Sequence, residues 1–197
     1  MARRGPLARN PESIVLGLAQ IRIGPYLTNI DDDTACLLAA ASIGAMANTK
    51  FTGNVDWFKL ESGFPLMEDL SIPIREGAQI ECAFKEVNPF TMTLAIGKDP
   101  AGVVTTISGE VGLGGRVAPE YVRAESVYTY PNGIDTMTIV FPRAQPVTNI
   151  ELDMQVEDTA AVPTILESKR ADDSLGAAGD AVWNLKPLGT IIFDCYD

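Results

Sequence analysis

The chain has 197 residues, a formal net charge of −11 at neutral pH and no histidine. Hydrophobic residues make up 46% and charged residues 21%, proportions that are typical of a folded globular protein and argue against a disordered one. The acidic balance disfavours tight general binding to nucleic acid, because it repels the phosphate backbone. Without histidine, the chain lacks the commonest general base, metal ligand and physiological pH switch.

The three cysteines, Cys36, Cys82 and Cys195, are widely spaced and odd in number. The sequence therefore predicts neither a disulfide framework nor a zinc site, and this pattern suits a reducing compartment. Cys82 is interpreted as a small core residue. The basic N-terminus is not followed by a long apolar run, and no stretch is long enough to cross a bilayer, so we expect no secretory signal and no membrane partner.

The first third of the chain is predicted to contain an arm, a strand and an ambiguous segment. Residues 1–13 carry three arginines and two prolines and are expected to form a flexible N-terminal arm, with residues 14–197 forming one domain. A first strand is predicted over 14–23. The acidic triplet 31–33 then precedes an alanine-rich segment, where a short helix and a small-residue loop both remain open. An aromatic strand is predicted over 51–60.

The next segment reads as two amphipathic strands, over 70–75 and 78–85, separated by a break at Glu76-Gly77. Alternation with a period of two places each apolar set on one face. We expect the following apolar residues to face the core: Leu70, Ile72, Ile74, Ala78, Ile80, Cys82 and Phe84. The polar residues between them are expected to face away from the core: Ser71, Arg75, Gln79, Glu81 and Lys85.

A short helix is predicted directly after these strands. Asn88 is a favourable N-cap, Pro89 suits the first helical position, and Gly97 can end the helix after about two turns. A glycine-rich region follows over 98–120.

The last part of the chain predicts more strands. Residues 121–130 and 134–141 flank Pro131-Asn132-Gly133, a strong hairpin signal. Further strands are expected over 147–156, 160–167 and 188–193, with a long loop over 168–184. Because these strands do not alternate with helices, the sequence predicts a mainly β protein: an antiparallel sandwich or barrel with one short flanking helix and long loops.

Several residue groups invite a chemical interpretation, but each has a simpler one. The adjacent aspartates at 31–33 lack the ligand spacing of a calcium loop. The glycine run 112–115 lacks the lysine and the strand–helix context of a phosphate loop. Pairs such as Glu81 with Glu86, or Glu151 with Asp153, are expected on any acidic sheet face. We therefore predict no catalytic, cofactor or metal site, and no enzyme activity. Trp57 suits a core or subunit-interface position better than a stacking platform.

The block SIGAMANTKFTGNVDWFKLESGFPLMEDLSIPIREGAQIECAFKEVNPFTMTLAIG resembles the major tail (tail tube) proteins of long-tailed bacteriophages. A small-residue "IGA" segment leads into a strand, a long charged hairpin follows, and a short helix opens with Asn88-Pro89 and ends with Leu94-Ala95-Ile96-Gly97. The Pro187-Leu188-Gly189 step before the last strand is also similar. The match of order covers about two thirds of the chain and excludes the regions 98–120 and 168–184.

This resemblance implies a virion structural protein whose hexameric rings stack into a tube, with the inner sheets closing into one barrel that conducts DNA. Its partners would be further copies of itself and the tape measure, terminator and baseplate proteins, with assembly in the host cytoplasm. It implies a negatively charged lumen lined by the outward residues named above, and subunit or ring contacts through Trp57, Asp172, Asp173 and Trp183. A tail terminator, a tube initiator, a contractile injection system tube and a ligand-binding β-sandwich remain alternatives.

Overall fold

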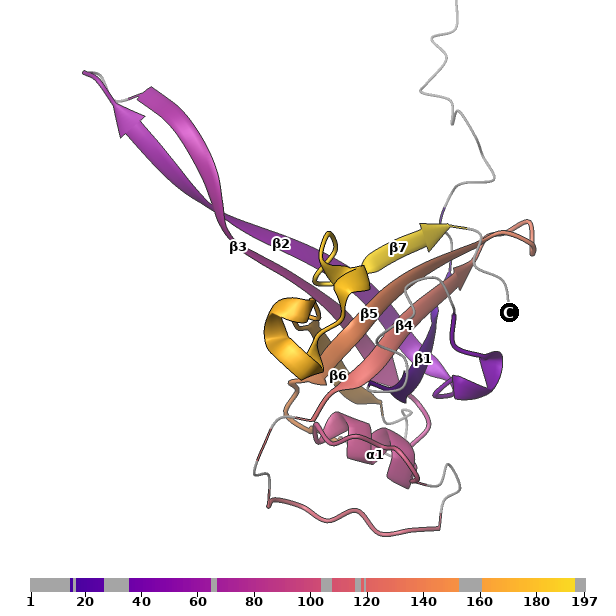
Figure 1. Cartoon of the computed structure of the whole chain (residues 1–197). Helices are drawn as coiled ribbons and strands as arrows, with labels where there is room; N and C mark the ends of the chain where they lie inside the picture. Colours follow the sequence, from indigo (N-terminus) through magenta and orange to yellow (C-terminus); the bar gives the residue numbers. More distant parts are fainter. Residues whose placement is uncertain are drawn as a thin grey trace, which may run out of the picture.

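The computed structural model of the protein describes residues 15, 17–26, 36–64, 67–103, 108–115, 118, 120–152 and 161–193. Within them the chain is mainly β, with one α-helix and three short 3-10 helices, which confirms the predicted fold class (Figure 1). The strands are β1 Gln20–Pro25, β2 Met46–Ser62, β3 Met67–Phe84, β4 Val122–Thr129, β5 Thr136–Pro146, β6 Val162–Ser168 and β7 Thr190–Phe193. The helices are α1 Pro89–Ala95, η2 Ala39–Ala41, η3 Asp173–Ala178 and η4 Ala181–Trp183.

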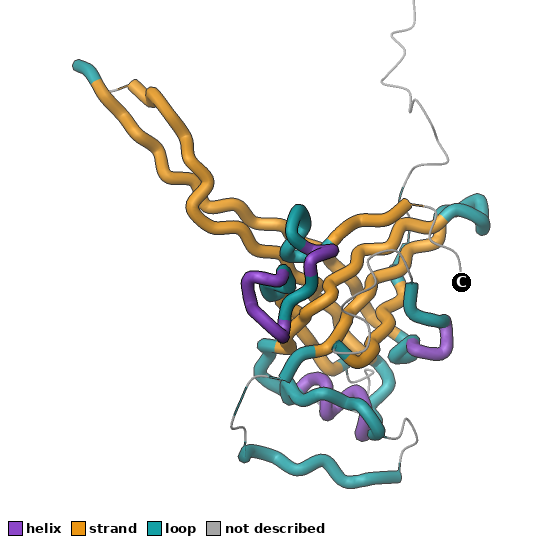
Figure 2. The backbone as a smooth tube through the Cα atoms, in the orientation of Figure 1, coloured by secondary structure: helices purple, strands orange, loops and turns teal. Residues whose placement is uncertain are grey.

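The strands form one antiparallel sheet in the order β1-β4-β5-β6-β3-β2, with β7 paired to β5 (Figure 2). The sheet curls until its two ends approach each other. There, the Ile43 amide donates to the Ile21 carbonyl at 3.1 Å, and the Ala19 amide donates to the Thr49 hydroxyl at 3.2 Å. This near-closure protects the edge of β1 and encloses the core.

The main core lies inside the curl and draws on six strands and the helix. Its fully buried members include Ile21, Ile80, Phe84, Leu94 and Leu166. A second, smaller cluster lies on the opposite face of β5, where Trp183 packs with Val140 and Ala171. The 171–189 segment therefore covers the outside of β5 and β7.

The helix α1 forms as predicted. Asn88 is its N-cap and accepts a hydrogen bond from the Thr91 amide at 2.9 Å, while the Thr91 hydroxyl accepts one from the Asn88 amide at 3.1 Å. This reciprocal pair satisfies two of the free donors at the helix start. Pro89 occupies the first turn, and Gly97 follows the helix with φ of 79°.

Two glycines of the resembling segments are required by their surroundings. Gly44 has φ of 93°, and a Cβ there would lie 2.5 Å from the Glu86 carboxylate. Gly189 has φ of 137°, and a Cβ would meet the Val140 carbonyl oxygen at 2.1 Å. At Gly189 a side chain would combine backbone strain with a clash against the backbone, whereas at Gly44 the positive φ is the main obstacle, because the end of the Glu86 side chain can shift.

Several predicted boundaries were wrong. The first strand begins at Gln20 rather than at residue 14, β3 runs without a break through Glu76-Gly77, and residues 147–152 are not a strand. The 168–184 loop contains η3 and η4. Cys36 is disulfide-bonded, which corrects the expectation of no disulfide, whereas Cys82 is free and buried as predicted. The predicted arm over 1–13 and the acidic triplet 31–33 lie outside the described residues.

Candidate interaction surface

A two-stranded ribbon projects from the curled sheet (Figures 1 and 2). We call it the arm: residues 53–62 of β2 and 67–77 of β3. The strand β6 pairs with β3 only from Phe84 to Gln79, so none of the strands in the described ranges continues as a third strand along the arm. Ten residues of strand span about 33 Å. An isolated two-stranded hairpin is marginally stable in water, and the arm is held at its base by the pairing of β2 and β3 within the main sheet.

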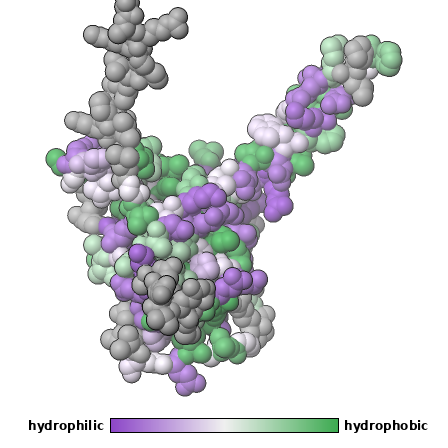
Figure 3. Space-filling view, turned by 180° about the vertical axis from the view of Figure 1, so that it is seen from behind, coloured by the Kyte–Doolittle hydropathy of each residue, from purple (hydrophilic) through white to green (hydrophobic). Residues whose placement is uncertain are grey.

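The arm exposes many large apolar side chains. Trp57 is 54% exposed and Ile74 67%, and Phe64 at the tip is fully exposed. Further exposed members are Val55, Phe58, Leu60, Met67, Leu70 and Ile72. Figure 3 shows hydrophobic side chains near the tip of the arm and, farther down, hydrophobic side chains interspersed with hydrophilic ones. The expectation that Leu70, Ile72 and Ile74 face the core was therefore wrong, because no other layer of the described residues reaches them.

A β-bulge explains why the predicted faces reverse along β3. From Asn48 to Asp56 each residue of β2 opposes one of β3, but the pair after Asp56–Arg75 is Trp57–Pro73, and Ile74 is skipped. One extra residue moves every later side chain to the other face. Beyond the bulge, Ser71 consequently lies on the face that is continuous with the core, which corrects its predicted outward position.

On the body side of the bulge the prediction is confirmed. Ile80, Cys82 and Phe84 are buried, and by alternation Arg75, Gln79 and Glu81 share the opposite face of β3. Burial raises the pKa of the Cys82 thiol to about 12. Lys85 is exposed just beyond the end of β3.

Two carboxylates on this outward face are paired with lysines. The Lys50 ammonium lies 3.2 Å from Glu81 Oε1, and Gln79 donates to the same oxygen at 2.8 Å. Lys50 and then Gln79 hold the pKa of Glu81 below its usual range. On the neighbouring strand β6, Lys169 pairs with Glu167 at 2.6 Å. The face thus presents two lysine–carboxylate ion pairs.

Two hollows flank the base of the arm. A cleft of about 780 Å³ lies between it and the 167–170 segment and is lined mainly by charged and polar residues, among them Asp56, Arg75 and Arg170. A groove of about 230 Å³ is apolar and is lined by Phe51, Phe141, Ile191 and neighbours. Ligand pockets are predominantly apolar and concave, so the cleft does not fit that description, whereas the groove extends the core to the surface.

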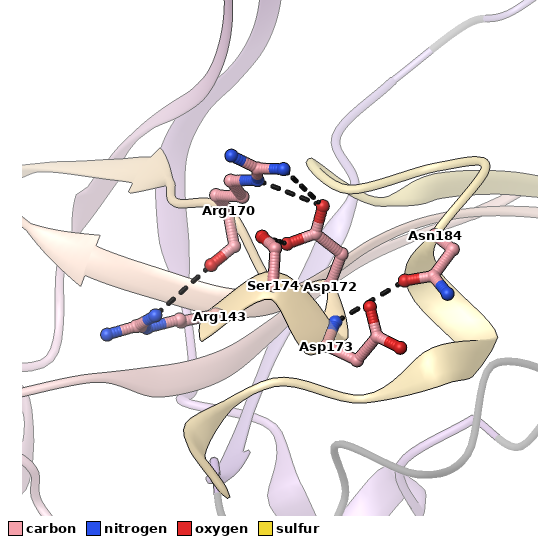
Figure 4. Close-up of polar contacts among 6 residues, drawn as sticks. All are labelled: Arg143, Arg170, Asp172, Asp173, Ser174 and Asn184. Carbon is pink, nitrogen blue, oxygen red and sulfur yellow. Dashed lines mark hydrogen bonds and ion pairs between the residues drawn. The ribbon is translucent and has the colours of Figure 1, made fainter. Parts of the chain in front are cut away.

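The predicted contact residues of the 168–184 segment have separate environments. Trp183 is fully buried beneath Lys186, so its side chain offers no surface to another subunit, which corrects its predicted role. Asp172 is also buried and accepts two hydrogen bonds from the Arg170 guanidinium, at 2.8 and 2.9 Å, and one from Ser174 (Figure 4). These donors, Arg170 first, lower its pKa.

Asp172 thus stabilises the segment locally, which corrects its predicted contact role, whereas Asp173 is exposed. In Figure 4 the Asp173 amide donates to Asn184 Oδ1 at 3.4 Å, and Arg143 donates to the Arg170 carbonyl at 3.2 Å.

A buried charged cluster escaped the sequence analysis. Glu125 accepts from Arg123 at 2.8 Å and from the Leu37 amide at 2.7 Å, and Arg22 donates to the Leu37 carbonyl. Arg22, Arg123 and Glu125 are all buried. Burial raises the pKa of Glu125, although Arg123 opposes that shift. The cluster binds the segment before β2 to the face of β1 and β4 that points away from the main core. No sequence pattern predicts a contact between residues 88 positions apart, such as Leu37 and Glu125.

A scan against models of protein families found no match, and a comparison with curated proteins found none either. None of the described helices has the length and apolarity needed to cross a membrane. Among the described residues, no group of three or more potential metal-ligating side chains occurs.

Proposed function

We propose that this chain is the tail tube subunit of a long-tailed bacteriophage, a structural virion protein whose hexameric rings stack into a DNA-conducting tube. The observation that carries the proposal is the arm, an uncovered ribbon with apolar side chains exposed along its length. Soluble monomers rarely expose contiguous apolar patches beyond a few hundred Å². We therefore expect the exposed ribbon to be buried in contacts with other subunits of an assembly.

The sheet supports the same proposal. The outer edge of β2 is unpaired over the arm within the described residues, and a closed ring uses such edges instead of leaving them open to aggregation. The mainly β fold with one short helix, and the order of segments in the resembling block, agree with this class.

The outward face of β2, β3 and β6 is the proposed lumen wall. Its carboxylates Glu81 and Glu167 are paired with lysines, and the whole chain is acidic. Paired charges leave few free cations for phosphate groups, which suits a wall past which DNA moves without sticking. Glu81→Lys would place a second cation beside Lys50 in each copy, and retention of DNA by assembled tubes should rise and weaken again with salt.

Assembly of the purified protein tests the proposal. Light scattering and negative-stain images over a series of protein and salt concentrations should reveal rings, and stacked tubes at high concentration. Single rings alone would favour a tail terminator. A stable monomer under all conditions would contradict an assembly function and favour the ligand-binding alternative.

A further inference from the structure

Apolar side chains on the arm and at its base form two strips on opposite faces. The inner strip comprises Phe51, Val55 and Trp57, which by register share the face of β2 that covers the core. The outer strip lies on the other face and comprises Phe58, Leu60, Leu70 and Ile72. The adjacent residues Trp57 and Phe58 are each about half exposed, so both faces of the ribbon are uncovered.

The surroundings of the two strips differ. The inner strip runs into the apolar groove at Phe51 and so continues the hydrophobic core to the surface. The outer strip is separated from the body by two polar cross-strand pairs, Thr52–Gln79 and Asp56–Arg75. One partner surface lying on one face cannot cover both strips, which therefore define two contacts.

Each strip has the size of one specific contact. A half-exposed aromatic side chain still offers about 100 Å² of surface, so each strip amounts to roughly 300–400 Å² of apolar area. Because little more than half of a typical interface is apolar, this corresponds to about 500–700 Å² per partner, somewhat below the roughly 800 Å² of a standard interface.

The arm's chemistry favours a second copy of this chain as the occupant. Over the arm, β3 contains Pro73 and the extra residue of each of two bulges, which obstruct its edge. No residue of β2 is skipped there, so the edge of β2 is open to pairing. Within the arm, Lys59 is paired with Glu68 at 2.7 Å. The arm carries more carboxylates than cations, which disfavours an anionic membrane as the occupant.

We infer that the two strips bind two different copies of this chain: the inner strip binds a neighbour in the same ring, and the outer strip binds a copy in the adjacent ring. This inference rests on the proposed tube function. The inner contact forms the ring because it extends an existing core and the open edge of β2. Each copy both inserts an arm and receives one, which is a heterologous contact that closes into a ring or continues along a tube.

Adjacent residues with opposite faces give a matched test. We would compare Trp57→Ser and Phe58→Ser with the control Asn54→Ser, at the exposed base of the arm, in full-length protein, after verifying that all three unfold at the wild-type temperature. Trp57→Ser should abolish rings at concentrations where the wild type forms them, a loss of tenfold or more in affinity per contact. Phe58→Ser should retain rings but lose stacked tubes. Asn54→Ser should assemble like the wild type.

The outcomes distinguish failure of the tube function from failure of the two-strip inference. A wild-type chain that stays monomeric contradicts the tube function. The two-strip inference alone is overturned if the wild type assembles but Trp57→Ser and Phe58→Ser lose the same assembly step. It is also overturned if neither variant loses a step. Rings without stacking in Phe58→Ser, together with no rings in Trp57→Ser, support it.

Discussion

The body half and the arm half of the β2–β3 hairpin have similar apolar alternation but opposite environments. In the body, Ile80 is 1% exposed within the main core, whereas Ile72, eight residues earlier on the same strand, is 46% exposed. Both belong to alternating apolar patterns. The difference is that β6 and the curled sheet cover the body half, while no part of the described chain covers the arm. An apolar strand face becomes core only where a second layer reaches it, and elsewhere it is a contact surface.

The largest expected effect comes from placing a charge in each half. Ile80→Asp should destabilise the fold by about 4 kcal/mol or more, because it buries an unpaired carboxylate. Ile72→Asp should change the free energy of unfolding by less than about 0.5 kcal/mol. Urea denaturation at low protein concentration measures both. Equal losses in the two variants would mean that the arm belongs to the cooperative core.

The two tryptophans give a second matched pair. Trp183→Ala should cost about 3–5 kcal/mol, because it opens a cavity beside Val140 and Ala171. Trp57→Ala should leave the thermal midpoint of the monomer nearly unchanged and weaken assembly instead. If Trp57→Ala lowered the midpoint as much as Trp183→Ala, the arm would be folded against the body in solution.

A smaller effect is expected at two asparagines. Asn88→Ala removes the N-cap of α1 and should cost about 1 kcal/mol. Asn54→Ala, at the exposed base of the arm, serves as its control and should be neutral. Thermal unfolding followed by circular dichroism distinguishes them. A neutral Asn88→Ala would show that packing, and not the cap, fixes the helix start.

The smallest effect concerns acid stability. Arg170 and Ser174 lower the pKa of Asp172 below its unfolded value, so its ionised form stabilises the fold above that unfolded value. This contribution disappears as the pH falls through the lowered pKa. Asp172→Asn should therefore reduce stability at neutral pH and flatten its decline in acid.

The arm supplies the control for this pH dependence. Lys59 and then Ser71 lower the pKa of Glu68. Because an exposed arm opens locally well before the core unfolds, Glu68→Gln should leave the pH dependence of global unfolding unchanged. A flattened curve in Glu68→Gln, measured by urea denaturation from pH 7 to pH 3, would indicate that arm and core unfold together.

Local signals predicted much of the fold correctly. The cap at Asn88 and the hairpin turn around Asn132-Gly133 depend on neighbouring residues, and the structure confirms both. The body half of β3 also follows its alternation. The aromatic strand around Trp57 was predicted too short, since β2 continues to Ser62.

The wrong predictions concern burial and strand faces that depend on residues distant in the sequence. A bulge at Ile74 reverses the faces of β3, and the only local sign of it is the preceding Pro73, which is equally compatible with an edge strand that has no bulge. Trp183 is buried because η4 folds over β5, and Glu125 is buried because Arg123 and the distant Leu37 amide satisfy it. Such partners cannot be read from spacing along the chain.

The sequence by itself determined that the chain is mainly β, where its one capped helix begins, and that Ile80, Cys82 and Phe84 face a core. These features depend on backbone preference and side-chain alternation over a few residues. Only the tertiary structure decided that the same hairpin leaves the body, that its apolar residues stay exposed on two faces, and that Trp183 is core. Burial depends on which layers meet in space, and one extra residue in a strand is enough to reverse a face.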